Sequence, residues 1–283
     1  MTRVRSQAER LLEQATADLE AGGVSSPRHD AEVLLSHVTG VPRMMLLGSA
    51  KPSGVQVQQY LALVAARATR VPLQHLTGSA AFRYVDVEVG PGVFVPRPET
   101  ELLAGWAIDH AKTLSSAVVV ELCAGAGAIS LSVVHEVPGA QVHAVELDEP
   151  AYEWAQRNLG GTGVDLRLGD MADAFGDLDG RVDVVVANPP YIPLDAWESV
   201  APEARDHDPS LALWSGDDGL DAMRVVDRVA WRLLKPGGVV GAEHADAQGE
   251  SAPAVFVDRW TDVRDHRDLA DRPRFVTATK PRR

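Results

Sequence analysis

The sequence predicts an α/β fold: a mostly parallel β-sheet that alternates with helices, preceded by a small helical bundle and a β-hairpin linker. From residue 117 onward, short apolar runs of strand length alternate with helix-like segments, which is typical of repeated β-α units. Before residue 71, apolar residues instead recur at helical spacing. We therefore expect the bundle at residues 1–71, the linker at 72–98 and the α/β domain at 99–283.

The composition limits the partners and bound groups to expect. The chain has 283 residues, enough for two domains. Its 27 Lys and Arg against 40 Asp and Glu give a net charge of −13, which disfavours a protein that grips nucleic acid through phosphates. A single cysteine, Cys123, allows no intramolecular disulfide and no multi-thiolate metal site, so no metal is expected. With no apolar run of bilayer-spanning or signal-peptide type, we expect a cytoplasmic protein and no membrane partner.

The N-terminal bundle is expected to consist of amphipathic helices. In the first helix, one face carries the apolar residues Val4, Ala8, Leu11, Leu12, Ala15 and Leu19. Gly22 and Gly23 end that helix, and Ser26 followed by Pro27 predicts the N-cap and first turn of the next. Further helical segments are expected at 44–47 and 55–70. Core packing accounts for these apolar faces, and nothing here predicts catalysis.

The linker is expected to form a β-hairpin. Strand-forming residues occupy 82–89, and Gly90-Pro91-Gly92 is a strong turn signal. The apolar segment 93–95 is the expected return strand. The polar run at 96–101 then opens a helix that should reach about Lys112.

The α/β domain is expected to contain seven strands. Five apolar runs predict strands at 118–122, 141–146, 164–168, 182–187 and 239–243. Two further strands, 261–267 and 274–279, are separated by a turn and are expected to close the sheet as an antiparallel hairpin.

A glycine-rich loop follows the first strand of this domain. It contains Cys123, Ala124, Gly125, Ala126 and Gly127, and such a loop lets a ligand approach the backbone closely. A dinucleotide fingerprint requires a third glycine where this chain has Ser130. Glu121, just before the loop, would repel a pyrophosphate but suits the ammonium group of a methionine moiety. The loop therefore favours S-adenosylmethionine over a dinucleotide.

Two acidic residues at later strand ends fit the same cofactor. Glu146 ends the second strand, where a carboxylate accepts hydrogen bonds from both ribose hydroxyls. Asp170, followed by Met171, ends the third strand, where contacts to the adenine are expected.

The fourth strand delivers Asn188, Pro189, Pro190 and Tyr191 at its carboxyl end, the edge of an open α/β sheet that binds ligands. The Asn188 side-chain oxygen and the Pro189 carbonyl can accept both hydrogens of an NH2 group, and Tyr191 offers a flat face for a planar amide or base. Amide nitrogen is a weak nucleophile, so the site must orient and polarise it. The sequence therefore predicts methyl transfer to a planar amide or amine nitrogen, with no strong general base.

On several segments the chain resembles bacterial release-factor glutamine N5-methyltransferases, the PrmC/HemK family. The matching segments are 74–78, 82–84, 96–101, 121–130, 188–191 and 234–238, with Asp208-Pro209, 211–213, Gly216 and Gly219. The Asn-Pro-Pro-Tyr tetrapeptide alone is shared with N6-adenine DNA methyltransferases. The segment 96–101 and the residues after the tetrapeptide narrow the resemblance to the release-factor enzymes.

The resemblance implies a class I (Rossmann-like), seven-stranded, S-adenosylmethionine-dependent methyltransferase domain behind a bundle that binds the substrate protein. It implies methylation of the side-chain amide N5 of the glutamine in the GGQ motif of class I peptide chain release factors, with S-adenosylhomocysteine as product. Carried over residue by residue, the cofactor contacts are those of 123–127, Glu146, Met171 and Asn188, while 188–191 hold the glutamine. The release factor is the expected partner, and direct nucleic-acid binding is not expected.

Other interpretations stay open. The same chemistry would serve a ribosomal-protein glutamine N5-methyltransferase or an N6-adenine DNA methyltransferase, the latter disfavoured by the net charge. A nicotinamide-dependent oxidoreductase is disfavoured by Glu121 and Ser130, and a non-catalytic cofactor-binding module would not need Asn188. The polar cluster 205–208 is expected to be solvated, and His244 to be a buried histidine with its hydrogen bonds satisfied.

Overall fold

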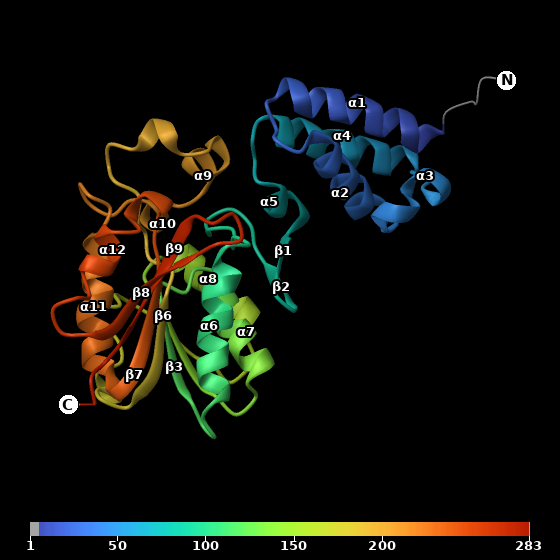
Figure 1. Ribbon diagram of the computed structural model, residues 1–283. Coiled ribbons are helices and arrows are strands. Elements are labelled where there is room, and N and C mark those ends of the chain that lie inside the picture. Colours follow the sequence, from blue (N-terminus) through green and yellow to red (C-terminus); the bar gives the residue numbers. More distant parts are fainter. Residues whose placement is uncertain (1–5, 283) are drawn as a thin grey trace. The chain divides into compact units, whose positions relative to one another are not determined.

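The computed structural model describes residues 6–282 and divides the chain into two compact units. One unit is helical; it extends to Ser79 and also contains Ala201–His207, a segment from the second half of the chain. The other contains Ala80–Val200 and the chain from Asp208 onward, and is built around a β-sheet (Figure 1). No helix within the described residues has the length and apolar character needed to cross a bilayer.

The helices expected in the first seventy residues are confirmed. They are α1 (Gln7–Ala21), α2 (Pro27–Thr39), α3 (Leu46–Ser49) after a 3-10 turn (Arg43–Met45), and α4 (Gly54–Ala68), followed by α5 (Leu73–Thr77). Ser6 and Ser53 cap α1 and α4 through their side chains, whereas Ser26 precedes α2 without a side-chain capping bond. The predicted apolar face of α1 is buried at Ala8, Leu12, Ala15 and Leu19. Val4 lies outside the described residues.

The segment Ala201–His207 packs with the helical unit through a cluster of ion pairs. Its helix α9 (Pro202–His207) carries Glu203, which accepts hydrogen bonds from Arg67 at 2.9 Å and from Arg70 Nε at 2.7 Å. Arg67 is 5% exposed and also donates to Asp30 at 2.8 Å. Because a buried guanidinium needs such partners, these contacts fix α9 at the end of α4, and the bond from Arg67 to Asp30 ties α4 to α2.

The linker hairpin is shorter than predicted, and its turn does not lie at the predicted Gly90-Pro91-Gly92. Its strands are β1 (Ser79–Phe82) and β2 (Val85–Glu88), so the chain reverses at Arg83 and Tyr84. Arg83 takes a left-handed conformation (φ 51°) and is held by Glu136 at 2.6 Å. The expected return strand at 93–95 was wrong: Val93 and Val95 are buried in the core of the sheet unit, and neither belongs to a strand. Burial, not strand pairing, explains that apolar run.

The sheet contains all seven predicted strands. They are β3 (Val118–Leu122), β4 (Gln141–Glu146), β5 (Asp165–Leu168), β6 (Val182–Ala187), β7 (Leu234–Glu243), β8 (Thr261–Arg267) and β9 (Pro273–Thr279). Their order is β5-β4-β3-β6-β7-β9-β8; the first five are parallel, and the β8–β9 hairpin closes the sheet antiparallel, as expected. β7 begins before the predicted residue 239 because its pairing with β6 continues past an irregularity near Val184.

The strand order indicates where along the sheet a ligand is expected to bind. From β3 the chain moves outward to β4 and β5 on one side, and it later returns to form β6 and β7 on the other. The order therefore reverses between β3 and β6, and ligands of open α/β sheets bind in the crevice at the carboxyl ends of such strands. The glycine-rich loop and the Asn-Pro-Pro-Tyr segment follow these two strands.

Helices cover both faces of this sheet (Figure 1). On one face lie α6 (Thr100–Lys112), α7 (Ala128–Glu136) and α8 (Glu149–Leu159); on the other lie α11 (Asp221–Leu233) and α12 (Ser251–Ala254). Alternate residues of β6 pack into the hydrophobic cores on the two faces of the sheet. Val184 and Val186 pack on the face of the first set of helices, and Val185 and Ala187 on the face of the second. Double burial explains why these strands are continuous apolar runs.

Candidate active site

The loop after β3 forms a tight turn that leads into α7. Three of its residues have left-handed backbones: Cys123 (φ 60°), Gly125 (φ 54°) and Gly127 (φ 80°). A Cβ on Gly125 would meet nothing within 4 Å, so open space lies beside the loop there. A Cβ on Gly127 would lie 2.9 Å from the Leu159 side chain, so α8 packs directly on this glycine. One glycine leaves room for a ligand and the other permits helix packing.

Glu146, at the end of β4, holds the loop in place. It is 9% exposed, and its carboxylate accepts a hydrogen bond from the Gly125 N–H at 2.7 Å and another from the Asp148 N–H at 2.8 Å. Burial raises the Glu146 pKa, and these backbone donors counteract that rise. A carboxylate can accept about four hydrogen bonds, so both oxygens keep acceptor capacity for a ligand hydroxyl.

Glu121, near the end of β3, is buried beside the first turn of α7. It is 2% exposed, and its Oε2 accepts hydrogen bonds from the backbone N–H (2.9 Å) and the hydroxyl of Ser130. Burial raises its pKa to about 8, against the opposing effect of Ser130. Glu121 therefore ties β3 to the first turn of α7. A nearby ammonium group would favour its ionised form.

The loops after β3 and β5 meet at two sulfur atoms. The Cys123 Sγ lies 3.6 Å from the Met171 Sδ. Asp170 is exposed, and its carboxylate accepts the Ala172 N–H at 2.8 Å, which fixes the turn after β5. The structure thus brings Cys123 and Met171 together and leaves the Asp170 side chain at the surface.

The tetrapeptide after β6 is held by the segment that follows it. Ile192 exchanges backbone hydrogen bonds with Leu213 and Ser215, both at 2.9 Å. The carbonyl of Tyr191 accepts from Gln248 Nε2 at 3.1 Å, and a Cβ on Gly219 would lie only 2.4 Å from that same carbonyl. No donor from residues 6–282 bonds the Pro189 carbonyl. The chain therefore fixes the tetrapeptide and leaves this carbonyl available as an acceptor.

The side chains of Asn188 and Tyr191 are anchored by two residues that sequence reasoning missed. Asn188 Nδ2 donates to the hydroxyl of Thr100 at 3.3 Å, so its Oδ1 is left without a donor from the described chain. The Tyr191 hydroxyl donates to Glu243 Oε1 at 3.3 Å. Thr100 lies in the segment 96–101 and Glu243 ends β7, so a polar residue at the carboxyl end of a buried strand was the available signal.

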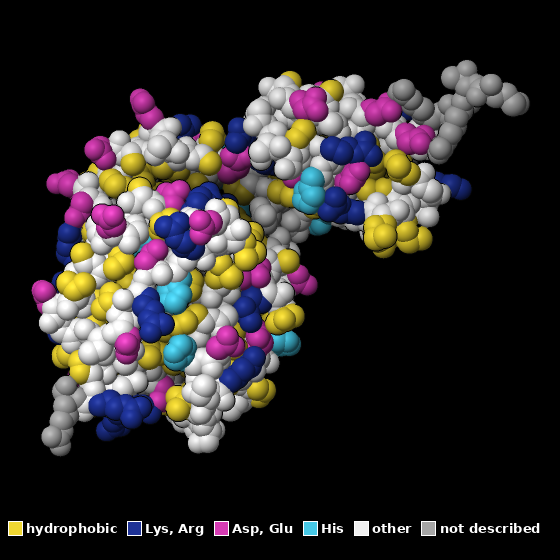
Figure 2. Space-filling view, viewed as in Figure 1, with side chains coloured by type: hydrophobic (Ala, Val, Ile, Leu, Met, Phe, Trp, Pro, Cys, Tyr) yellow, Lys and Arg dark blue, Asp and Glu magenta, His cyan; other side chains and the backbone are white. Residues whose placement is uncertain are grey.

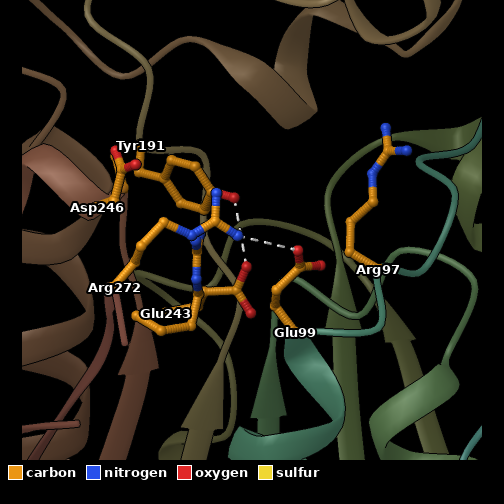
Figure 3. Close-up of a pocket in the computed structure, with 8 residues that line it drawn as sticks. Arg97, Glu99, Tyr191, Glu243, Asp246 and Arg272 are labelled. Atoms are coloured by element: carbon orange, nitrogen blue, oxygen red, sulfur yellow. Dashed lines mark hydrogen bonds and ion pairs between the residues drawn. The ribbon is translucent and has the colours of Figure 1, made fainter. Parts of the chain in front are cut away.

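A pocket of about 350 Å³ opens beside Tyr191 (Figure 3). Its lining is Arg97, Glu99, Tyr191, Glu243, Ala245, Asp246, Arg272 and Arg274. The charges are largely paired, since Arg272 lies 3.6 Å from Glu99 and Arg97 2.8 Å from Asp208. The pocket is thus polar but not strongly charged, and an aromatic ring forms one wall.

Two other sequence expectations have clear outcomes. His244 is buried, with its ring nitrogens 2.8 Å from the Ala245 carbonyl and 2.9 Å from Asp265, so it is satisfied as expected. The expectation that 205–208 is solvated was wrong for Asp208. Its side chain is fully buried against Arg97, and burial raises its pKa to about 6.

Asn158 is a further residue that sequence reasoning missed. Its carboxamide donates to the carbonyls of Ala126 and Glu88, both at 2.9 Å, and accepts from the Glu88 N–H. It therefore joins α8, the glycine-rich loop and β2. An asparagine inside a helix gives no local sequence signal for such a role.

The residues at this edge fit S-adenosylmethionine. Open space lies at Gly125, carboxylate acceptors lie at Glu146 and Glu121, and the Asn188 oxygen is free at the neighbouring strand end. When bound, this cofactor supplies an electrophilic methyl group. Its cationic sulfonium and ammonium groups suit a site whose side-chain charges are acidic.

Comparison with known proteins agrees with this geometry. A family model described as the PrmC N-terminal domain matches residues 10–78, and one described as the methyltransferase small domain matches residues 98–201. A release factor glutamine methyltransferase of Streptomyces coelicolor is 55% identical, covering 94% of this chain and 96% of the relative. One of Mycolicibacterium smegmatis is 46% identical, covering 99% of each.

One relative has a different name. A 4-amino-L-phenylalanine/4-methylamino-L-phenylalanine methyltransferase of Streptomyces pristinaespiralis is 40% identical, covering 92% of this chain and 91% of the relative. The release factor glutamine methyltransferases of Streptomyces coelicolor and Mycolicibacterium smegmatis are more similar to this chain, at 55% and 46% identity over nearly its whole length. The chain belongs to the family of S-adenosylmethionine-dependent release factor glutamine methyltransferases.

Proposed function

We propose that this protein transfers the methyl group of S-adenosylmethionine to the side-chain amide N5 of the glutamine in the GGQ motif of class I peptide chain release factors. One observation carries the chemistry. The Asn188 Oδ1 and the Pro189 carbonyl lie on adjacent residues, and neither accepts a hydrogen bond from the described chain. Two such acceptors match the two hydrogens of a carboxamide NH2 group.

In this proposal the tetrapeptide orients and polarises the nucleophile. Hydrogen bonds from the NH2 group to Asn188 and Pro189 would hold the nitrogen in line with the methyl group and enrich its lone pair. Pro190 stiffens the backbone between these acceptors and Tyr191, whose ring offers a stacking face for the planar amide. Positioning of this kind lowers barriers without a general base, because the amide proton can leave after the methyl arrives.

The cofactor would lie along the carboxyl ends of β3, β4 and β5. Glu146 would accept the ribose hydroxyls, and Glu121 would favour the ammonium group through its negative charge. The loop residues Cys123, Ala124, Gly125, Ala126 and Gly127 would border the methionine moiety, with Asp170 and Met171 at the adenine. The open space beside Gly125 and the acceptor capacity of Glu146 support this arrangement.

The release factor is the proposed protein partner, and residues 1–71 are the proposed region that binds it. The match of residues 10–78 to the PrmC N-terminal domain supports this role. A substrate of translation would place the reaction in the cytoplasm. Direct nucleic-acid binding is not part of the proposal: Figure 2 shows basic side chains dispersed among acidic ones on the face that it draws, and the net charge is −13.

The test is mass spectrometry of a recombinant class I release factor incubated with the protein and S-adenosylmethionine. We expect one added methyl group, mapped to the GGQ glutamine, and none on a factor in which that glutamine is replaced by asparagine. The Asn188→Ala variant serves as the enzyme control and should leave the factor unmodified. The proposal would be refuted if the factor stayed unmodified although the wild-type protein was folded and bound S-adenosylmethionine.

A small aromatic amine is a second candidate substrate, because the relative named for 4-amino-L-phenylalanine is 40% identical. An aryl amine is also planar and carries two N–H donors, so the same acceptors would suit it. Parallel reactions with 4-aminophenylalanine, a ribosomal protein and duplex DNA separate these candidates. Methylation of the free amino acid at a rate above that of the release factor would favour this candidate.

A further inference from the structure

Two buried polar atoms of residues that line the pocket beside Tyr191 have no hydrogen-bond partner. Glu243, at the end of β7, is 1% exposed; its Oε1 accepts the Tyr191 hydroxyl, whereas its Oε2 has no partner within the described chain. Arg274, on β9, has a side chain that is 12% exposed, and its Nε is unpartnered within the same residues. Because unpaired buried groups destabilise a fold, both atoms call for a partner that the chain itself does not supply.

The fold brings these two residues to one end of the sheet. Strands β7 and β9 are antiparallel neighbours, in which Glu243 pairs with Phe275, the residue directly after Arg274. Other bonds hold both side chains in place. Figure 3 shows the Glu243 carboxylate turned toward the Tyr191 hydroxyl, and Arg274 donates from its Nη2 to Asp268 at 3.1 Å. The pocket therefore offers a fixed acceptor and a fixed donor beside its aromatic wall.

The charges of the pocket favour a neutral ligand. The three arginines of its lining already have carboxylate partners. Arg97 lies 2.8 Å from Asp208, while Arg272 and Arg274 each lie 3.1 Å from Asp268. The α-carboxylate of a free amino acid would find no unpaired cation among them, and the carboxylates of the pocket would repel it. A peptide group is polar but uncharged, so it escapes this repulsion.

A single residue within a polypeptide supplies both of the missing partners. In an extended chain the N–H and C=O groups of one residue point to the same side, as they do in a hydrogen-bonded pair of an antiparallel sheet. The N–H group can then donate to Glu243 Oε2 while the C=O group accepts from Arg274 Nε. A glutamine side chain is short, so a residue whose amide reaches Asn188 keeps its main chain near Tyr191.

We propose that the pocket beside Tyr191 binds the main chain of the target residue, with its N–H on Glu243 Oε2 and its C=O on Arg274 Nε. This inference rests on the proposed function and names the part of the substrate that these two groups recognise. They select a glutamine inside a polypeptide over a free amino acid, which carries a carboxylate where the polypeptide has a neutral peptide group. Because their role is to bind the substrate, their loss should raise KM and leave kcat unchanged.

An ester bond before the target glutamine tests the contact to Glu243. Cell-free translation with the α-hydroxy analogue of glutamine at the GGQ position replaces the main-chain N–H by oxygen and leaves the side-chain amide intact. We expect the wild-type protein to methylate this ester factor with a KM about tenfold to 100-fold above that of the ordinary factor, the contribution of a hydrogen bond to a charged group. The value of kcat should stay the same.

Glu243→Gln should by itself raise the KM for the ordinary factor by a similar amount. Its remaining oxygen can still accept the Tyr191 hydroxyl, but its NH2 group then faces the main-chain N–H where Oε2 accepted it. The ester should raise the KM of this variant by at most about a further threefold, since the contact is already lost. S-adenosylhomocysteine affinity should not change, because the pocket lies at β7 and β9 and the proposed cofactor site at β3, β4 and β5.

Arg274→Lys separates the two contacts. Lysine keeps a cation beside Asp268 but has no Nε–H, so this variant should raise the KM for the ordinary factor and still show the full effect of the ester. Glu136→Gln, the same chemical change as Glu243→Gln at the ion pair with Arg83, is the matched control. It should match the wild type with both factors.

Two kinetic results would overturn the proposal. One is that the losses from Glu243→Gln and from the ester multiply. The other is that the wild type treats both factors alike, as expected if water alone satisfied the two buried atoms. Calorimetric binding to the S-adenosylhomocysteine complex needs no methyl transfer, so it distinguishes these results from failure of the proposed function. Stronger binding of the ordinary factor without methylation would refute the proposed chemistry and retain the role of the pocket. Equal binding would refute the pocket, and binding of neither factor would refute both.

Discussion

Gly125 and Gly127 lie two residues apart in the same loop. The structure nevertheless predicts that alanine at Gly127 costs more stability, whereas alanine at Gly125 costs more cofactor affinity. Both have left-handed backbones, which an L-residue adopts at a cost of about 1–2 kcal/mol. At Gly125 the added methyl group meets open space, so that conformational term is the whole effect on stability. At Gly127 the methyl group would lie 2.9 Å from Leu159, which adds about 1–3 kcal/mol of overpacking.

We therefore expect Gly125→Ala to destabilise the sheet unit by about 1–2 kcal/mol and Gly127→Ala by about 2–5 kcal/mol. Cofactor affinity should follow the reverse order, since the space beside Gly125 is where the cofactor is proposed to lie. Urea unfolding followed by tryptophan fluorescence measures the first quantity. All six tryptophans lie between Trp106 and Trp260, so this signal reports the sheet unit alone. Calorimetry with S-adenosylhomocysteine measures the second.

A double-mutant cycle of Gly127→Ala with Leu159→Ala isolates the steric part. Removing the Leu159 side chain leaves a cavity that the methyl group added by Gly127→Ala partly fills, so the two changes together should destabilise less than their sum. Equal unfolding free energies for Gly125→Ala and Gly127→Ala, or an additive cycle, would refute the reasoning. Such results would mean that α8 does not pack on the loop as the structure has it.

Three further predictions concern separate parts of the molecule. Asn188→Ala should lower kcat by at least about 100-fold, as loss of one oriented hydrogen bond does in other sites, while S-adenosylhomocysteine affinity stays within about threefold; a parallel loss of affinity would contradict the assigned role. Burial raises the pKa of the Cys123 thiol, so iodoacetamide should alkylate it more than about tenfold more slowly in the folded than in the urea-unfolded protein, and rapid alkylation of the folded protein would count against the structure. Burial opposes ionisation of Glu203, but hydrogen bonds from Arg70 and Arg67 outweigh it and lower its pKa to about 2. Because the folded pKa is depressed, the contribution of Glu203 to the helical unit is present above the ordinary pKa of 4.5 and is lost as the pH falls toward 2. Hydrogen exchange of Ala201–His207 should thus be faster in Glu203→Gln than in the wild type at neutral pH, with the gap narrowing in acid; a gap independent of pH would contradict the ion pair.

Much of the fold followed from local patterns in the sequence. The strands 118–122, 141–146 and 182–187 were located without error, because buried parallel strands are continuous apolar runs bounded by turn residues. The glycine-rich loop and the tetrapeptide could be assigned to the sheet edge for the same reason, since each follows such a run directly. Where an apolar run had two explanations, as at 93–95, the pattern alone chose wrongly. Val93 and Val95 are apolar because they are buried in the core.

Local sequence patterns could not identify the residues that hold the side chains and loops of the site in place. Thr100, Glu243 and Asn158 lie 88, 55 and 30 residues from Asn188 along the chain, and only the strand order β3-β6-β7 and the packing of α6 and α8 bring their side chains to the loops. The sequence by itself determined the fold class and the cofactor, and it predicted the chemistry of the tetrapeptide, because these depend on periodicity and on residues adjacent in the chain. The tertiary structure alone decided which way the Asn188 amide faces and why Asp208 is buried, because hydrogen-bond polarity and desolvation depend on neighbours that are distant in sequence.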